Sequence, residues 1–253
     1  MTELGAPTNL QLLPDEEFRR VLCVAAHPDD LEYGTSAAVA KWVARGVVVK
    51  YLLLTSGEAG MAEPPDVIGP LRSAEQRAAC NAVGVEELEI LDYPDGTLVY
   101  GLDIRRDIAR VIREFRPDVV VTGSWEVEFV AGLNQADHRV AGLATVDAVR
   151  DADNAWVFPE LAQAGLEKWG VRYLLVSGDS RPTHAVEITG EPLNKGIASL
   201  AAHARYLEHV VGHPRPDELL PAFTGMVGKA IGVPNAVAFR VYDLIPARSA
   251  NSE

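Results

Sequence analysis

Four short runs rich in apolar residues follow one another through the first half of the sequence, and a longer helical pattern comes after each. The apolar runs span residues 21–26, 47–54, 87–91 and 119–122, and the helical patterns span residues 33–45, 71–83, 102–115 and 135–150. Apolar runs of this length are typical of strands covered on both faces. Their alternation with helices predicts an α/β fold: a mostly parallel sheet with right-handed crossovers and helices on both faces.

The second half of the chain is less regular. Three segments have the pattern of strands, 173–177, 184–188 and 236–244, and two look helical, 191–209 and 217–230. No repeat or linker divides the chain, so we expect residues 1–253 to form a single domain with a C-terminal elaboration. A lead-in (1–19) and a frayed tail (248–253) would flank it. Residues 58–70, rich in Gly and Pro, predict a mobile loop over the strand ends.

The composition limits the partners that the chain can have. Its 23 basic and 36 acidic residues give a net charge of −13, which argues against nucleic acid or an anionic membrane as the main partner. No uncharged apolar run approaches the roughly 18 residues of a membrane span, and no secretory signal is visible. Cys23 and Cys80 fit buried free thiols in a reducing compartment. We therefore expect a soluble, cytoplasmic protein.

Two loops of the predicted sheet carry side chains that can bind a metal ion. His27, Asp29 and Asp30 lie where the first predicted strand ends, and His138 lies in the segment after the fourth. With the common strand order 3-2-1-4, both loops line the crevice where open α/β sheets bind ligands. His27, Asp30 and His138 then form the kind of three-ligand set that catalytic zinc uses, with one zinc ion per chain and an open position for water.

Asp29 is the candidate general base in this arrangement. Zinc lowers the pKa of a bound water from 15.7 to roughly 7, and a neighbouring carboxylate can take the proton. The alternative is a capped helix start, with the carboxylates on the helix dipole. Asp137 and His138 at the partner position favour the metal. Asp137 itself is expected to support the ligands from a second layer or to cap the helix, and Asn134 fits the N-cap.

These motifs resemble those of the PIG-L/LmbE-like family of zinc-dependent N-deacetylases. Residues 26–32 are similar to its Ala-His-Pro-Asp-Asp-x-Glu signature, and Asp137-His138 to the end of its His-x-Asp-His signature. Residues 55–58 and 72–75 also look like family segments, and the resemblance covers roughly residues 20–190. It implies a Rossmann-like fold and a zinc-dependent hydrolase that removes an N-acetyl group from an amino sugar or amino-sugar conjugate through metal-bound hydroxide.

The resemblance implies the same three zinc ligands and the same base, and it places Arg72 and Asp95 near the sugar. Each of the last two has a simpler alternative. Arg72 could form an ion pair with Glu75 on an exposed helix face. Asp95 could be a turn residue before Gly96.

One position departs from the family pattern. Gln135 stands where the family has the first histidine of His-x-Asp-His. The resemblance implies that this histidine stabilises the oxyanion or protonates the leaving amine. Gln135 can donate a hydrogen bond to an oxyanion, an interaction worth about 2.7–4 kcal/mol, but it cannot shuttle a proton. The proton would then come from Asp29 or from another histidine such as His184.

This substitution leaves a second function open, that of a non-catalytic sugar- or metabolite-binding member of the family. A dinucleotide-binding domain is a weaker alternative, because no Gly-x-Gly-x-x-Gly follows the first strand. The sequence leaves open the N-acyl substrate, a homo-oligomeric state, and the choice of zinc over iron or cobalt.

Overall fold

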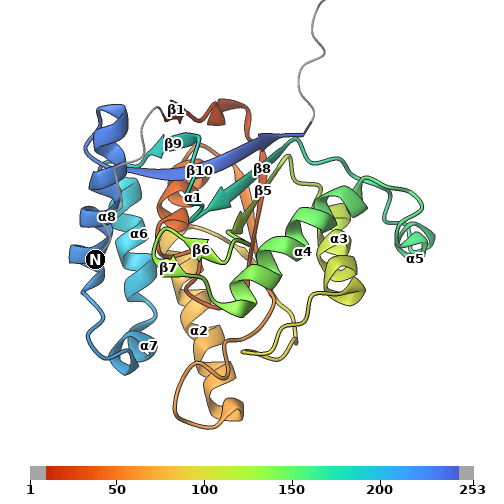
Figure 1. Cartoon of the computed structure of the whole chain (residues 1–253), viewed down its shortest axis with the longest axis horizontal. Helices are drawn as coiled ribbons and strands as arrows, with labels where there is room; N and C mark the ends of the chain where they lie inside the picture. The colour runs from red at the N-terminus through yellow and green to blue at the C-terminus, as the bar shows by residue number, and fades with distance from the viewer. Residues whose placement is uncertain (1–9, 245–253) are drawn as a thin grey trace, which may run out of the picture.

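The computed structural model describes residues 10–244, and an eight-stranded sheet runs through them (Figure 1). The order across the sheet is β1-β9-β10-β8-β5-β2-β3-β4. Five neighbouring strands pair in parallel: β8 (Tyr173–Ser177), β5 (Val119–Gly123), β2 (Arg20–Ala25), β3 (Val48–Leu53) and β4 (Glu87–Ile90). The mostly parallel sheet and the predicted order of its first four strands are confirmed.

The remaining strands extend the sheet beyond β8. The strand β10 (Ala236–Asp243) runs antiparallel between β8 and β9 (His184–Glu187), and β1 (Gln11–Leu12) pairs with β9 at the edge. A short hairpin of β6 (Glu128–Phe129) and β7 (Gly132–Leu133) follows β5. The C-terminal elaboration thus continues the same sheet. The single-domain interpretation of residues 1–253 stays a prediction, since residues 1–9 and the tail 248–253 lie outside the described residues.

Helices cover both faces of the sheet, as expected. Figure 1 shows one layer made of α1 (Thr35–Ala44), α2 (Pro65–Val83), α6 (Glu191–Ala201) and α8 (Pro216–Ile231). The other layer holds α3 (Leu102–Phe115) and α4 (Ala136–Ala152). Three short helices complete the described chain: η1 (Asp15–Glu17), α5 (Pro159–Gln163) and α7 (Ala204–His209).

The pleat of β2 explains why its sequence is apolar throughout. Val21 and Cys23 face the layer of α1 and α6, whereas Leu22 and Val24 face the layer of α3 and α4. All four side chains are fully buried, because alternate residues of a strand point to opposite faces. Cys23 and Cys80 are buried and unpaired, as predicted.

Two helix boundaries differ from the prediction. The helix α2 begins at Pro65 and not at residue 71, so the loop after β3 is shorter than expected. Pro70 lies just over one turn into the helix, where its missing N–H removes a single backbone hydrogen bond. The helix predicted over 191–209 is divided at His203, whose side chain is fully buried while its backbone leaves the helical region. None of the described helices combines the length and apolar character needed to cross a membrane.

Candidate metal centre

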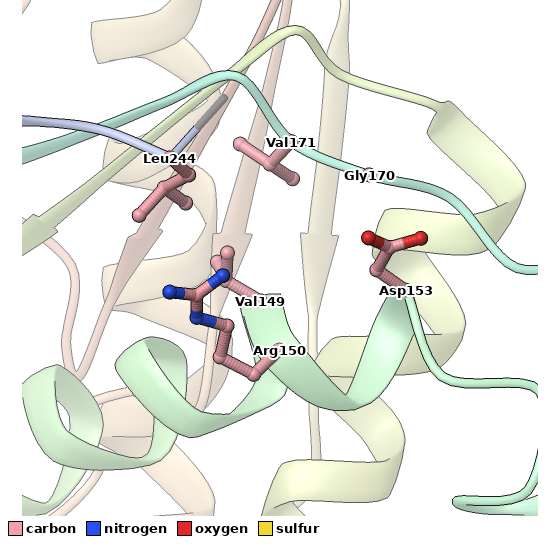
Figure 2. Close-up of a pocket in the computed structure, with 6 residues that line it drawn as sticks. All are labelled: Val149, Arg150, Asp153, Gly170, Val171 and Leu244. Carbon is pink, nitrogen blue, oxygen red and sulfur yellow. The ribbon is translucent and has the colours of Figure 1, made fainter. Parts of the chain in front are cut away.

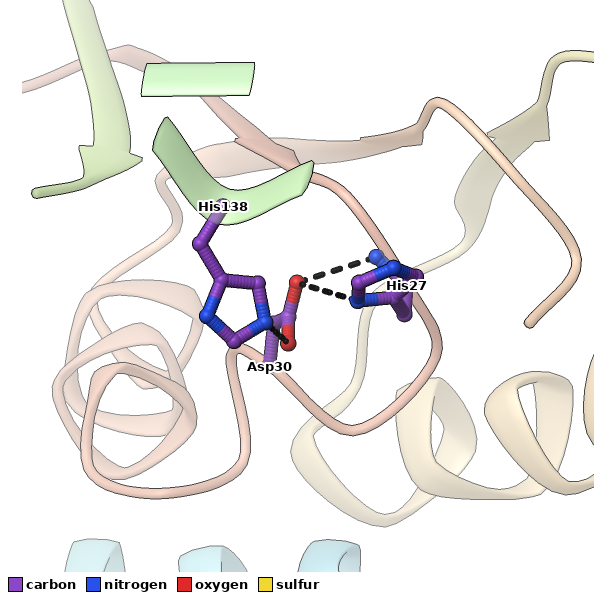
Figure 3. Close-up of side chains that lie close together, drawn as sticks. All are labelled: His27, Asp30 and His138. Carbon is purple, nitrogen blue, oxygen red and sulfur yellow. Dashed lines mark hydrogen bonds and ion pairs between the residues drawn. The ribbon is translucent and has the colours of Figure 1, made fainter. Parts of the chain in front are cut away.

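The turn after β2 and the start of α4 bring together the three predicted metal ligands (Figure 3). One oxygen of Asp30 lies 3.0 Å from Nε2 of His138, and the other lies 3.6 Å from Nδ1 of His27. The backbone N–H groups of Ala26 and His27 donate to that second oxygen at 3.0 and 2.9 Å. The candidate ligand atoms of the three residues lie within 4.8 Å of one another. The topology argument from sequence therefore placed them correctly, while their role as ligands stays a prediction.

The far nitrogen of the His27 ring faces two carboxylates. Its Nε2 lies 3.0 Å from Asp95 and 3.4 Å from Asp137. Asp137 is buried and also accepts hydrogen bonds from the backbone N–H groups of Gly96 at 2.8 Å and Leu98 at 3.1 Å. A carboxylate behind a ligating histidine fixes the ring and its tautomer. Asp137 thus ties the loop after β4 to α4 and orients His27 from behind.

His27, Asp95 and Asp137 could form a second cation site, since their ligand atoms also lie within 4.8 Å of one another. Their oxygens are already engaged, however. Both oxygens of Asp137 accept backbone hydrogen bonds, and the second oxygen of Asp95 accepts the N–H of Ala59 at 2.8 Å. The set of His27, Asp30 and His138 offers two ring nitrogens and one carboxylate, the kind of donor set that catalytic zinc uses, so it is the better candidate. Asp95 supports it through His27, and a contact of Asp95 with a sugar stays a prediction.

Asn134 supports the other histidine. Its Nδ2 donates to the carbonyl oxygens of Ser124 at 2.6 Å and Glu126 at 3.0 Å, so its Oδ1 is the end that lies 3.3 Å from Nδ1 of His138. The His138 ring then donates from Nδ1, so Nε2 is the nitrogen that faces Asp30 and that a metal ion would take in place of a proton. The N-cap predicted for Asn134 is wrong, since Gln135 holds that position. In the sequence, the only indication of this contact was the position of Asn134, a polar residue four positions before the candidate ligand His138.

The charges around the three ligands suit a cation. Although burial raises the pKa of Asp30, His138 and His27 hold it well below its usual range. Burial lowers the pKa of His27, but hydrogen bonds and charge from Asp30 and Asp95 raise it to about 11. The pKa of His138 is likewise raised by Asp30 against the effect of burial. Two nitrogens and a carboxylate that attract positive charge form a donor set that fits a divalent metal ion such as zinc.

Asp29 lies beside this set in an unusual backbone conformation. Its φ of 85° falls in the left-handed region, and its side chain is buried. Burial raises the pKa of Asp29 to about 8, the charge of Arg72 opposes that rise, and Asp30 and Glu32 add to it. A carboxyl group with a pKa near neutrality can both accept and return a proton at working pH.

Arg72 is buried against the same turn. Its guanidinium donates to the carbonyl oxygens of Pro28 at 2.6 Å and Gly57 at 3.1 Å and to Asp29 at 3.2 Å. The alternative of an exposed ion pair with Glu75 is therefore wrong. A Cβ added at Gly57 would run into the Arg72 guanidinium, which accounts for glycine there. The ring of Tyr206 covers the guanidinium at 4.0 Å, so a direct contact of Arg72 with a sugar stays a prediction.

The two candidates for the missing proton donor lie in different places. Gln135 is exposed at the N-terminus of α4, three residues before His138. His184 begins β9, three strands from β5 in the sheet order, or about 14 Å at the usual strand spacing. Its Nδ1 lies 2.8 Å from the hydroxyl of Thr183. Gln135 thus lies close to His138 in the chain while His184 lies several strands away, and a role of either residue in proton transfer stays a prediction.

A cavity of about 20 Å³ lies at the opposite end of α4 (Figure 2), where Val149, Arg150, Asp153, Gly170, Val171 and Leu244 line it. His138 and Ala152 are separated by 14 residues of this helix, or about 21 Å. A larger cleft of about 240 Å³ lies along the segment between Tyr93 and Ile104, which contains the loop around Asp95. The larger cleft is lined on both sides of Asp95 in sequence, by Pro94 and Thr97, whereas the smaller cavity lies at the far end of α4.

Fold and site together define an α/β protein with a candidate His-Asp-His cation site at the carboxyl edge of a parallel sheet. Residues 22–149, over half of the chain, match the PIG-L family model, described as GlcNAc-PI de-N-acetylase. The chain belongs to the PIG-L family, and its LmbE-like relatives are deacetylases.

Two curated relatives have amino-sugar substrates in their names. A diacetylchitobiose deacetylase of Thermococcus kodakarensis is 29% identical over 180 residues, covering 70% of this chain and 66% of its own length. A 1D-myo-inositol 2-acetamido-2-deoxy-alpha-D-glucopyranoside deacetylase of Kineococcus radiotolerans is 32% identical over 250 residues, covering 75% and 69%. The solved N,N'-diacetylchitobiose deacetylase of Pyrococcus horikoshii shares the fold at a TM-score of 0.84 and 21% identity, over 94% of this chain and 90% of that one.

Proposed function

We propose that this chain is a metal-dependent hydrolase that removes the N-acetyl group from an amino sugar or amino-sugar conjugate. The observation that carries the proposal is the cluster of His27, Asp30 and His138, with the buried carboxylate of Asp29 one residue away. The amino-sugar deacetylases among the relatives support the same class of substrate.

His27, Asp30 and His138 would hold one zinc ion per chain. A divalent ion bound there supplies Lewis acidity, which polarises an amide carbonyl and makes water more acidic. Neighbouring side chains would keep the two ligand histidines in the right orientation. Asp95 and Asp137 fix the His27 ring, and Asn134 fixes the His138 ring.

Asp29 would take the proton of the attacking water. Its raised pKa lets it hold that proton and return it to the leaving amine, which removes the need for a second histidine. Arg72 keeps the carboxylate in place through its hydrogen bond of 3.2 Å and balances its charge while it is ionised. Gln135, exposed at the start of α4, would donate a hydrogen bond to the oxyanion. The cleft between Tyr93 and Ile104 would receive part of the substrate.

The test is acetate release by the purified chain loaded with zinc. Diacetylchitobiose and the acetamido-glucopyranosyl inositol are the first substrates, since relatives carry those names. Asp29→Asn should keep its metal and lose about 100- to 10,000-fold in kcat, because the amide cannot accept the proton. Asp153→Asn, at the far end of α4, is the matched control. A fully active Asp29→Asn variant would refute the assigned base.

The exposed Gln135 keeps a second candidate open, a sugar-binding protein without turnover. Binding of either substrate without acetate release by the metal-loaded chain would favour it. Gln135→His then becomes informative, because it restores the side chain that the family pattern has at that position. The cytoplasmic location and the oligomeric state stay predictions.

A further inference from the structure

The candidate base has a backbone conformation that its own side chain does not favour. Asp29 is one of three non-glycine residues with positive φ between residues 10 and 244. A side chain adopts this region rarely, and such residues persist only where the surroundings hold them. The hydrogen bonds that reach the Asp29 backbone should therefore include the group that holds it.

Gln76 provides that group from α2. Its Oε1 accepts the N–H of Asp29 at 3.0 Å, and its Nε2 donates to Oε1 of Glu32 at 3.1 Å. The backbone N–H of Glu32 in turn donates to the carbonyl oxygen of Asp29 at 2.9 Å. One amide thus joins the two ends of the turn that carries Asp29 and Asp30. The carboxylate of Glu32 fixes the direction of this amide, because only an N–H₂ end can donate to it.

The far end of the bridge is anchored as well. The hydroxyl of Ser199 on α6 can donate its one proton either to the same oxygen of Glu32 at 3.3 Å or to the carbonyl oxygen of Ala79 at 3.0 Å. Gln76, Glu32 and Ser199 are all fully buried. Water therefore does not compete for the bridge, and α2, α6 and the turn are held in one register.

We propose that Gln76 is a positioning residue that holds Asp29 in its left-handed conformation and so aims the Asp29 carboxylate at the reacting atoms. The proposal rests on the proposed function, because it assumes that Asp29 is the base. With an ordinary φ, the Asp29 side chain would leave Arg72 and the metal centre. The amide of Gln76 itself has both ends occupied within the bridge and does not reach substrate.

The first test replaces the amide by an apolar side chain of similar length. Gln76→Met should keep wild-type zinc content and KM and lose kcat by about 10- to 100-fold, the usual effect of removing a group that supports a site from behind. Gln163→Met, at an exposed position of α5, is the matched control and should equal the wild type. Wild-type kcat in Gln76→Met would overturn the proposal.

The second test keeps the hydrogen-bond pattern and exchanges the two partners. The double variant Gln76→Glu with Glu32→Gln retains one carboxylate and one amide, so residue 76 still accepts from Asp29 and still pairs with residue 32. It should recover the wild-type kcat that Gln76→Met loses. A double variant as slow as Gln76→Met would contradict the role given to this hydrogen bond.

A crystal structure separates this proposal from the proposed function. If the wild type releases no acetate from any substrate, the deacetylase assignment fails, and the backbone of Gln76→Met decides the positioning role alone. Asp29 should then leave the left-handed region. Retention of a φ near that of the wild type would overturn the positioning role even in an active enzyme.

Discussion

Asn134 gives the most specific prediction, because a single buried side chain supports both the fold and a candidate metal ligand, His138. Its amide makes three hydrogen bonds, to Ser124, Glu126 and His138, and the residue is 6% exposed. Asn134→Leu keeps the size and removes all three. At about 1 kcal/mol net for each bond, the variant should lose about 2–3 kcal/mol of stability. For a chain of this length that lowers Tm by about 4–12 °C.

The same change should weaken metal binding. Without Asn134, nothing holds the His138 ring in the tautomer that presents Nε2, so we expect zinc affinity to fall about 10- to 100-fold. Competition with a chromophoric chelator measures this affinity, and a melting curve of the metal-free protein measures the stability separately. Asn81→Leu, at an exposed position of α2, is the control. An Asn134→Leu protein that melts lower but binds zinc as tightly as the wild type would refute the link between Asn134 and His138.

Three further outcomes follow from the described contacts. Dialysis against a chelator should abolish acetate release, and about one equivalent of zinc per chain should restore it; activity that survives complete metal removal would contradict a metal-dependent reaction. Asp15→Ala should lower the free energy of unfolding by about 2–3 kcal/mol, because the buried Asp15 accepts hydrogen bonds from Trp42 at 2.8 Å and Arg45 at 2.6 Å. A denaturant titration measures this loss, and an unchanged midpoint would show that the two hydrogen bonds do not stabilise the fold. Burial, aided by the charge of Arg72, lowers the pKa of His203 in the folded protein to about 3. Between pH 6.5 and 3, the unfolded chain therefore binds a proton at His203 that the folded protein does not bind. Stability should therefore fall by about 1.4 kcal/mol for each pH unit below 6.5, and His203→Met should remove that part of the slope.

The sequence predicted those parts of the fold in which the pattern of apolar residues along the chain matches the faces that are buried in the structure. The strand at β2 is apolar on both faces because helices cover both faces, and this is visible in Val21 through Val24 alone. The strand order then followed from connectivity, and it placed His138 opposite His27 and Asp30 before any distance was known.

The supporting contacts were not predictable in the same way, because they depend on how loops and helices pack, and several join residues far apart in sequence. Gln76 has the pattern of an ordinary helical glutamine, yet it accepts the backbone N–H of Asp29, 47 positions earlier. An ion pair of Arg72 with Glu75 on an exposed face remained an alternative, because spacing within a helix does not reveal which face is buried. Asn134 is a residue type that is common at helix N-caps, and only the structure shows that its amide donates to the carbonyl oxygens of Ser124 and Glu126.

The stacking of Tyr206 on Arg72 has a consequence for how far this chain could be shortened. The family model ends at residue 149, yet the ring that shields the Arg72 guanidinium and the hydroxyl that anchors Glu32 come from α7 and α6, at Tyr206 and Ser199. A fragment reduced to the family motifs would expose the guanidinium and leave the Glu32 anchor missing. The late helices thus help to hold the candidate base in place, although they carry neither of the two family signatures.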